Sequence, residues 1–267
     1  MPKVELVRAD WQVLVLKADR IYGVALQRGV ECALPGAVVR ITCGIVEART
    51  ALKERPVDLL LSGFNVTGGD VLPLLCAGVM DRGWRRALIV TGRKEERVLA
   101  LLQAAPIAGV FDPDKEDLTR LVAVLPAVVV GGSYWSPSVL MHLRRLRTDA
   151  DALCRRLTLV EMLVFSAVGD GSDDATAAAR LGMKPSSVQS VRSSLHEKLG
   201  VQHRGELMRL AVQKGVVHIT AQGVHRPGFD SLLASHCERR RGSSMPFPGK
   251  PTVERSDLGT GSSLSIP

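Results

Sequence analysis

Glycines divide residues 157–217 into four apolar segments of helical spacing, and this division limits the possible folds more than any other feature. Breaks lie at Gly171, Gly182 and Gly200, and the last segment stops at Gly215. A glycine just past a helix supplies the left-handed conformation that closes it. The break over 182–184 has the length of the tight turn between two crossing helices. The segment therefore predicts a four-helix unit that contains a helix-turn-helix.

The third of these helices has one apolar side and one polar side. The apolar stripe, which is expected to face the core, consists of Val188, Val191, Leu195 and Leu199. The polar side consists of Ser187, Gln189, Ser190, Arg192, Ser193 and His196. Glutamine and arginine can hydrogen-bond base edges, and serine can reach bases or phosphates. This pattern indicates a surface that reads a DNA groove, although periodicity alone fits the solvated face of an ordinary helical bundle equally well.

A family pattern runs through the whole segment. The positions that carry it are Leu157, Thr158, Glu161, Gly171, Ala178, Leu181, Gly182, Val188, Lys198, Leu199, Gly200, Val201, Arg204, Glu206, Leu207 and Gly215. At these positions, and without a gap, the segment resembles the LuxR-type helix-turn-helix of the NarL/FixJ class of bacterial response regulators. The resemblance implies binding to double-stranded DNA, with bases facing Gln189, Ser190 and Ser193 and phosphates facing Lys184, Ser187, Arg192 and Lys198. Ser186, at the start of the same helix, completes the expected DNA-binding set.

Three departures from that family bear on the strength of binding. Ala175 and Gln189 stand where the family usually has lysine, and Val191 stands where it usually has histidine. Residues 157–220 hold 7 Lys and Arg against 6 Asp and Glu, so their formal charge is 7 − 6 = +1. Because basic side chains neutralise phosphates, we expect weak binding by the isolated domain, strengthened by the arginines of 137–156 and by homodimer formation. The expected dimer surface lies on the fourth helix and comprises Leu207, Leu210 and Val212.

Short apolar runs alternate with helical stretches over the first ~135 residues. The expected strands are 13–16, 37–42, 58–64, 87–92 and 109–111. The expected helices are 26–34, 48–55, 71–80, 94–105 and 117–125. This alternation indicates an α/β doubly wound parallel sheet with helices on both faces. Such a sheet places its functional site at the carboxyl ends of the strands.

The loop over 63–70 and the segment over 131–137 carry a second resemblance. In the order and spacing of its elements, the region of about 13–137 resembles a receiver domain. That resemblance implies a carboxylate nucleophile at the end of the third strand and a pair of acids after the first strand that holds Mg²⁺. It also implies a hydroxyl group after the fourth strand and a lysine after the fifth.

Most of these groups are missing from the chain. The nucleophile position falls on Gly63, or on Ser62 if the register shifts by one, and neither can form an acyl phosphate. The positions of the acid pair fall on Lys17 and Ala18, and the position of the lysine falls on Pro113. Thr91 retains the hydroxyl group. We therefore expect a degenerate receiver without ordinary aspartyl phosphorylation, which holds a constitutive dimer or is switched by a regulatory protein or ligand.

Four aspartates near the same strand ends could form a substitute metal site: Asp58, Asp70, Asp112 and Asp114. A structural interpretation is favoured for each, because Asp58 precedes a strand, Asp70 can cap the next helix, and the other two lie in a polar turn. We expect no metal, no cofactor and no catalytic group, so the chain is not predicted to be an enzyme.

Cysteine usage and hydropathy indicate the compartment. The five cysteines form no C-x-x-C pair, which favours reduced thiols in the cytoplasm. Neither a signal peptide nor an apolar run of ~18 residues is present, so no membrane partner is expected. The expected organisation is a receiver-like domain over 1–137, a basic helical linker over 138–156, a DNA-binding domain over 157–220 and a disordered tail over 221–267, with a marginal helix at 229–241. The expected function is that of a transcription regulator; the alternative is a protein–protein adaptor whose DNA-binding domain is vestigial.

Overall fold

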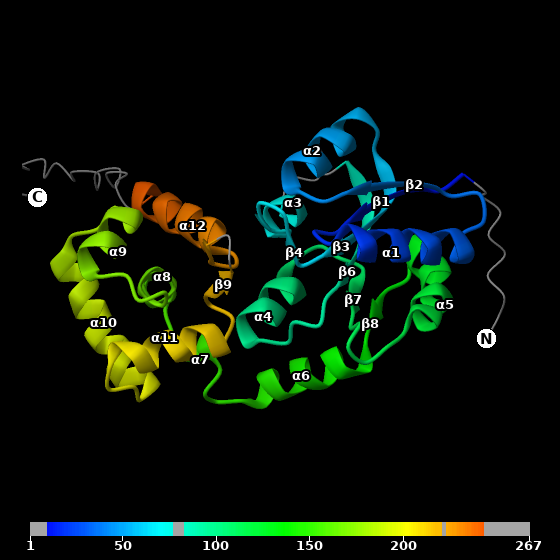
Figure 1. Ribbon diagram of the computed structural model, residues 1–267. Coiled ribbons are helices and arrows are strands. Elements are labelled where there is room, and N and C mark those ends of the chain that lie inside the picture. The colour runs from blue at the N-terminus through cyan, green and yellow to red at the C-terminus, as the bar shows by residue number, and fades with distance from the viewer. Residues whose placement is uncertain (1–9, 77–82, 221–222, 243–267) are drawn as a thin grey trace, which may run out of the picture.

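A six-stranded parallel sheet forms the centre of the amino-terminal half in the computed structural model, which describes residues 10–76, 83–220 and 223–242 (Figure 1). Its strands run in the order β2-β1-β3-β6-β7-β8. They are β1 (Gln12–Leu16), β2 (Val38–Thr42), β3 (Val57–Gly63), β6 (Trp84–Val90), β7 (Gly109–Phe111) and β8 (Tyr134–Trp135). Every pairing in this sheet is parallel. The doubly wound sheet predicted from the sequence is confirmed, and β8 adds a strand that the apolar runs did not indicate.

Helices cover both faces of this sheet. On one face lie α1 (Arg20–Ala33) and α5 (Leu118–Val129). On the other lie α2 (Ile45–Glu54), α3 (Leu72–Leu75) and α4 (Glu96–Ala104). Strand β3 is buried at every position, because a parallel strand between two helical layers meets no solvent on either face. A short hairpin of β4 (Asn65–Val66) and β5 (Gly69–Asp70) follows it.

Two predicted helices differ in extent from the observed ones. Helix α1 begins six residues before the predicted 26–34 segment, because Asp19 caps it by accepting the amide hydrogen of Tyr22 at 3.0 Å. Of the helix predicted over 71–80, the described part is α3, and residues 77–80 lie outside the described residues.

The basic linker consists of two helices rather than the single one predicted. These are α6 (Pro137–Thr148) and α7 (Leu153–Arg156). Between them Asp149 is extended, and its carboxylate accepts the amide hydrogen of Asp151 at 2.8 Å, which favours a turn over a continuing helix. Val139 and Leu143 are buried with the amino-terminal core, whereas Leu153 is buried with the carboxy-terminal one.

The carboxy-terminal half contains the predicted four-helix unit: α8 (Leu159–Val168), α9 (Asp174–Leu181), α10 (Pro185–Leu199) and α11 (Arg204–Gln213). All four predicted break positions, Gly171, Gly182, Gly200 and Gly215, have positive φ. The stripe on α10 points inward as expected, with Val188 and Leu195 fully buried and Val191 and Leu199 packed against the same core.

The chain continues in ordered elements beyond that unit. A hairpin of β9 (His218–Thr220) and β10 (Gly223–His225) leads into α12 (Phe229–Gly242). Helix α12 packs on α8, and Phe229 is buried in the carboxy-terminal core. The prediction of disorder from 221 onward is therefore wrong for 223–228, whereas the marginal helix predicted over 229–241 is confirmed as α12, and 243–267 lie outside the described residues. Among the described helices, none combines the length and apolar character that a membrane crossing requires.

Candidate nucleic-acid interface

The polar side of α10 is open to solvent. Six of the predicted DNA-binding residues have exposed side chains: Lys184, Ser186, Ser187, Gln189, Ser190 and Ser193. Pro185 occupies the first turn, and the buried stripe on the opposite side anchors the helix. The hydroxyl groups of Ser190 and Ser193 each donate to the carbonyl four residues back, at 3.0 and 3.1 Å. Their lone pairs are thus directed outward on a surface made mainly of short side chains.

Arg192, on the same helix, forms an ion pair with an acid at the start of α9. Its guanidinium lies 2.9 Å from a carboxylate oxygen of Asp174, the first residue of α9, and both side chains are half-buried. Asp173, the residue before, is the one that caps α9, accepting the amide hydrogen of Thr176 at 2.7 Å. Asp174 is therefore free to face α10 and fix the position of Arg192.

Lys198 is also engaged within the domain. Its ammonium group lies 2.8 Å from Glu161 on α8, which forms a capping box with Thr158. Burial alone would raise the pKa of Glu161, but hydrogen bonds from Lys198, Thr158 and Ser194 lower that pKa to about 2. This charged cluster ties the carboxyl end of α10 to the start of α8, so a phosphate would compete with Glu161 for Lys198. Burial of Glu161 was not apparent from the sequence.

The predicted dimer surface on α11 is only partly available. Leu207 is fully buried and Leu210 packs against the same core, so both support the fold of the domain. Val212 is 40% exposed, and Met208, which the sequence analysis did not include, is 36% exposed.

The expected nucleophile position lies at the carboxyl end of β3, in the amino-terminal half. A neighbouring lysine occupies the space into which a side chain at that position would extend. A Cβ atom added to Gly63, the last residue of β3, would lie 3.1 Å from Cδ and 3.3 Å from Nζ of Lys17. The ammonium group of Lys17 also lies 4.5 Å from the ring centre of Tyr22. Burial lowers the pKa of Lys17, and the nearby Asp19 opposes that shift. A cation thus stands where the receiver resemblance implies acids and Mg²⁺.

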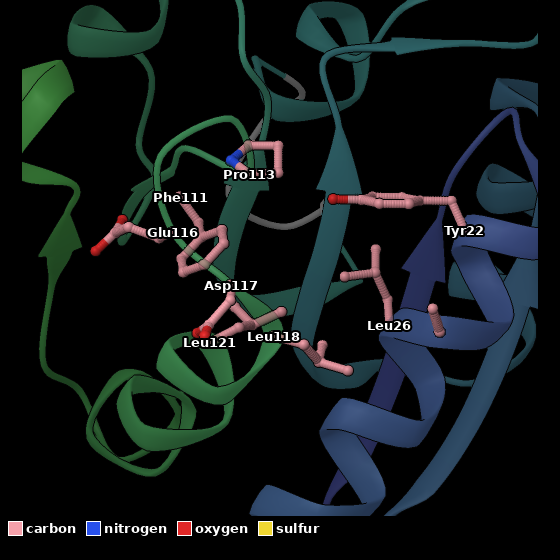
Figure 2. Close-up of a pocket in the computed structure, with 9 residues that line it drawn as sticks. Tyr22, Leu26, Phe111, Pro113, Glu116, Asp117, Leu118 and Leu121 are labelled. Carbon is pink, nitrogen blue, oxygen red and sulfur yellow. The ribbon is translucent and has the colours of Figure 1, made fainter.

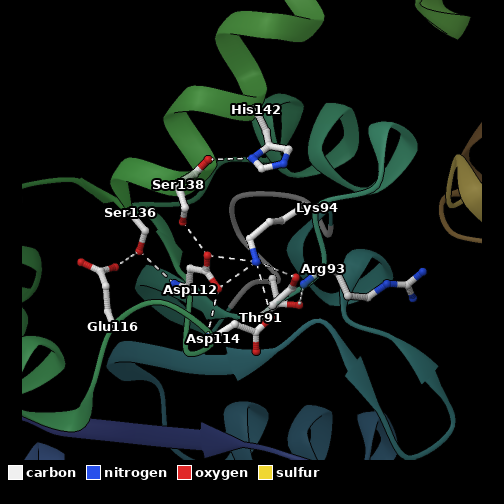
Figure 3. A network of polar contacts seen from close by, with 10 residues as sticks. Thr91, Arg93, Lys94, Asp112, Asp114, Glu116, Ser136, Ser138 and His142 are labelled. Atoms are coloured by element: carbon white, nitrogen blue, oxygen red, sulfur yellow. Dashed lines mark hydrogen bonds and ion pairs between the residues drawn. The ribbon is translucent and has the colours of Figure 1, made fainter.

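Two acids, Asp112 and Asp114, flank Pro113, the position at which that resemblance implies a lysine (Figure 3). Asp112 follows β7 with a fully buried side chain, and Lys94 places its ammonium group 3.0 Å from it and 3.4 Å from Asp114. Burial would raise the pKa of Asp112, but hydrogen bonds from Ser138 and Lys94 lower it. The interpretation of Asp112 as part of a polar turn is wrong for its side chain, which connects the sheet to α6. Thr91 is buried, and its hydroxyl oxygen accepts the amide hydrogen of Arg93 at 3.2 Å.

The other two aspartates have structural roles as well. Asp58 is buried in β3 and accepts the amide hydrogen of Gln12 at 3.0 Å. Asp70 accepts the amide hydrogen of Leu72, the first residue of α3, at 3.0 Å, although Val71 and not Asp70 occupies the N-cap position of that helix. Within the described residues, no three His, Cys, Asp or Glu side chains are grouped as a metal ion would require.

A cavity of about 210 Å³ opens between α1 and α5, and Tyr22, the aromatic neighbour of Lys17, forms part of its wall (Figure 2). Its walls are mainly apolar and include Tyr22, Leu26, Phe111, Pro113, Leu118 and Leu121. The hydroxyl group of Tyr22 points across the cavity toward Pro113, as Figure 2 shows. Burial raises the pKa of Tyr22, and Asp114 adds to that shift.

Comparison with known proteins gives partial sequence matches and an extensive likeness of fold. No protein-family model matches the chain. It is 35% identical over 90 residues to the transcriptional regulatory protein UhpA of Escherichia coli, covering 34% of this chain and 43% of UhpA. It is 28% identical over 102 residues to the transcriptional regulatory protein YdfI of Bacillus subtilis, covering 37% of this chain and 48% of YdfI. The chain thus spans less than half the length of each of these relatives.

The structure of RcsB from Salmonella enterica serovar Typhimurium, bound to promoter P1flhDC in the presence of the phosphomimetic BeF3⁻, is similar over most of the chain. The TM-score is 0.53 at 16% identity, and the match covers 77% of this chain and 99% of RcsB. The shared feature is the fold: a parallel α/β receiver-like domain followed by a helical carboxy-terminal region.

Proposed function

We propose that this chain is a DNA-binding transcription regulator of the response-regulator type that acts in the cytoplasm. The observation that carries the proposal is the polar side of α10, which is exposed along Lys184–Ser193 while the opposite side is anchored in the core. A helix presented in this way can enter the major groove. The names of UhpA and YdfI as transcriptional regulatory proteins, and the capture of RcsB on a promoter, support the same role.

Regulation without aspartyl phosphorylation is the second part of the proposal. Gly63 offers no carboxylate, and Lys17 occupies the adjoining space with a positive charge that would repel Mg²⁺. A partner protein or a small ligand takes over the switching role in this proposal. The cavity between α1 and α5 is the candidate place for a small ligand, since its wall is mainly apolar and includes Tyr22, whose ring contacts Lys17.

Pairing of two copies is the third part. An isolated domain with a formal charge of 7 − 6 = +1 over 157–220 has few cations for phosphates, so two domains on one site would strengthen binding. Val212 and Met208 are the exposed apolar side chains on α11 that a dimer contact can bury. Two-fold pairing predicts paired half-sites on the DNA.

The test is duplex binding by the full chain. Genome-wide capture of bound DNA identifies the preferred site, and affinity is then compared between the wild type and a Gln189→Ala/Arg192→Ala/Ser193→Ala variant. The matched control replaces Gln103, Arg28 and Thr119, exposed residues on receiver helices, with alanine. We expect at least a tenfold loss for the α10 variant, because base contacts contribute about 1–3 kcal/mol each, and no change for the control. Unchanged affinity in the α10 variant contradicts the proposal.

The engagement of Arg192 and Lys198 within the domain favours one alternative, a protein–protein adaptor with a vestigial DNA-binding surface. Binding to random duplex DNA at several salt concentrations separates the two functions. A regulator shows affinity that falls steeply with salt because counterions are released from DNA, whereas an adaptor shows no measurable binding at low salt.

A further inference from the structure

The segment that follows the four-helix unit lies against α4 of the receiver-like half. The backbone carbonyl of Lys214 accepts the amide hydrogen of Arg97 at 2.9 Å. The approach is close enough that glycine is required on this segment. A Cβ atom on Gly215 would lie 2.6 Å from Cβ of Glu95, and one on Gly228 would lie 2.7 Å from the side chain of Leu101.

Glu96, the first residue of α4, joins three parts of the chain. Its carboxylate accepts hydrogen bonds from the amide of Leu153, at the start of α7, and from the ammonium group of Lys214, the latter at 2.8 Å. The carboxylate is buried, so little water competes for these bonds. The side chain of Glu96 therefore connects both the linker and the DNA-binding half to α4.

One charge in this contact is poorly compensated. The Nε and Nη2 atoms of Arg97 are buried and have no hydrogen-bond partner among the described residues, and burial lowers the pKa of this guanidinium. A buried charge without a partner weakens the arrangement that buries it.

We infer that residues 214–220 and 223–228 form a clasp that holds the DNA-binding half on α4 through Glu96 and that opens reversibly because closure buries two guanidinium nitrogens of Arg97 without hydrogen-bond partners in the described part of the chain. When the clasp is closed, the polar side of α10 stays exposed, so the clasp fixes the orientation of the DNA-reading helix and does not cover it. The inference does not depend on the proposed function, since it concerns contacts within one chain.

Two backbone amides report closure directly. Leu153 and Arg97 are the first residue of α7 and the second of α4, and amides at these positions have no acceptor within their own helix. Their protection from hydrogen exchange therefore depends on Glu96 and on the carbonyl of Lys214. Amide hydrogen exchange, measured by NMR on the full chain without DNA, therefore reports opening of the clasp independently of the affinity for DNA.

We expect Glu96→Gln and Lys214→Met to accelerate exchange at Leu153 and Arg97 by roughly tenfold, because each removes a hydrogen bond between charged groups. The amides of Leu60 and Leu88, in the central strands, serve as internal controls and should not change, which separates opening from global unfolding. Unaltered exchange at both reporter amides, in either variant, overturns the inference.

The opposite effect is expected when the unpaired cation is removed. Arg97→Met keeps much of the aliphatic side chain and eliminates the buried charge, so exchange at Leu153 should slow by several-fold. Arg28→Met, at an exposed position on α1, is the matched control and should leave that rate unchanged. Equal or faster exchange at Leu153 in Arg97→Met contradicts the role assigned to Arg97.

Discussion

The guanidinium of Arg192 lies 2.9 Å from the carboxylate of Asp174, so the one arginine on the exposed part of α10 is held by an acid from the neighbouring helix. In complexes with DNA, an arginine binds bases or phosphates through the N–H groups of its guanidinium. Here the same guanidinium contacts Asp174. Asp174 therefore both orders Arg192 and competes with DNA for it.

Replacing that acid should change how binding depends on salt. We expect Asp174→Asn to raise the affinity for random duplex DNA several-fold and to steepen the salt dependence by about 0.9 in log–log slope, the value for one added phosphate contact. Fluorescence anisotropy titrations at four salt concentrations measure both quantities. Glu54→Gln, an exposed change on α2, is the control. An unchanged slope would show that Arg192 does not reach a phosphate once it is released.

The buried cluster around Glu161 should make the DNA-binding half sensitive to acid. The pKa of Glu161 lies near 2 in the folded protein and near 4.5 without its partners, so its contribution is complete above pH 4.5 and disappears as the pH falls toward 2. We expect Glu161→Gln to lower the free energy of unfolding by about 2 kcal/mol at pH 7, with a smaller difference at pH 3. Chemical denaturation at the two pH values tests this, and a difference independent of pH would contradict it.

Placing a carboxylate at the end of β3 should not be sufficient for phosphorylation. In Gly63→Asp the new side chain meets the ammonium group of Lys17, and no acid pair is present beside it to hold Mg²⁺. We expect no added phosphoryl mass after incubation with acetyl phosphate and Mg²⁺, as measured by intact-mass spectrometry. The wild type is the matched control for phosphorylation elsewhere. Appearance of one phosphoryl group on the variant alone would show that Lys17 does not block the site.

The ordered extension after the four-helix unit should contribute to stability. Phe229, the first residue of α12, is buried in the carboxy-terminal core although it lies beyond the predicted DNA-binding domain over 157–220. We expect Phe229→Ala to lower the free energy of unfolding by about 3 kcal/mol, at the low end for a buried phenylalanine. Urea denaturation followed by circular dichroism measures the change, with Ser231→Ala on the exposed side of α12 as the control. A change below about 0.5 kcal/mol would place Phe229 outside the folded core.

Local patterns were sufficient to predict most of the fold. The breaks at Gly182 and Gly200 were found because left-handed backbone strongly favours glycine, and the structure places both in that conformation. The strands were found because buried parallel strands have nearly continuous apolar sequences, as β3 does. Strand β8 was missed because its two residues give too short a pattern, and its pairing with β7 depends on the tertiary fold.

The site was less predictable, because ion pairs between distant residues leave no periodic signal. Lys198 and Glu161 are separated by 37 positions, and only the fold shows that they form a pair. Asp112 was assigned to a solvated turn because aspartate beside proline is common in turns, whereas the side chain is buried by α6 and bonded to Ser138. The exposed positions of α10 were accessible from sequence, since helical geometry alone decides which residues share a face.

The position of Lys17 beside Gly63 also bears on how this lineage can change. An aspartate that arose at Gly63 alone would form an internal ion pair, and an acid that arose at Lys17 alone would have no acceptor beside it. Neither first mutation would confer a phosphate-dependent response on which selection could act. Under the proposed regulation without aspartyl phosphorylation, absence of the phosphoryl switch is therefore difficult to reverse, and descendants of this protein are expected to diversify the signals they sense while keeping the glycine–lysine pair.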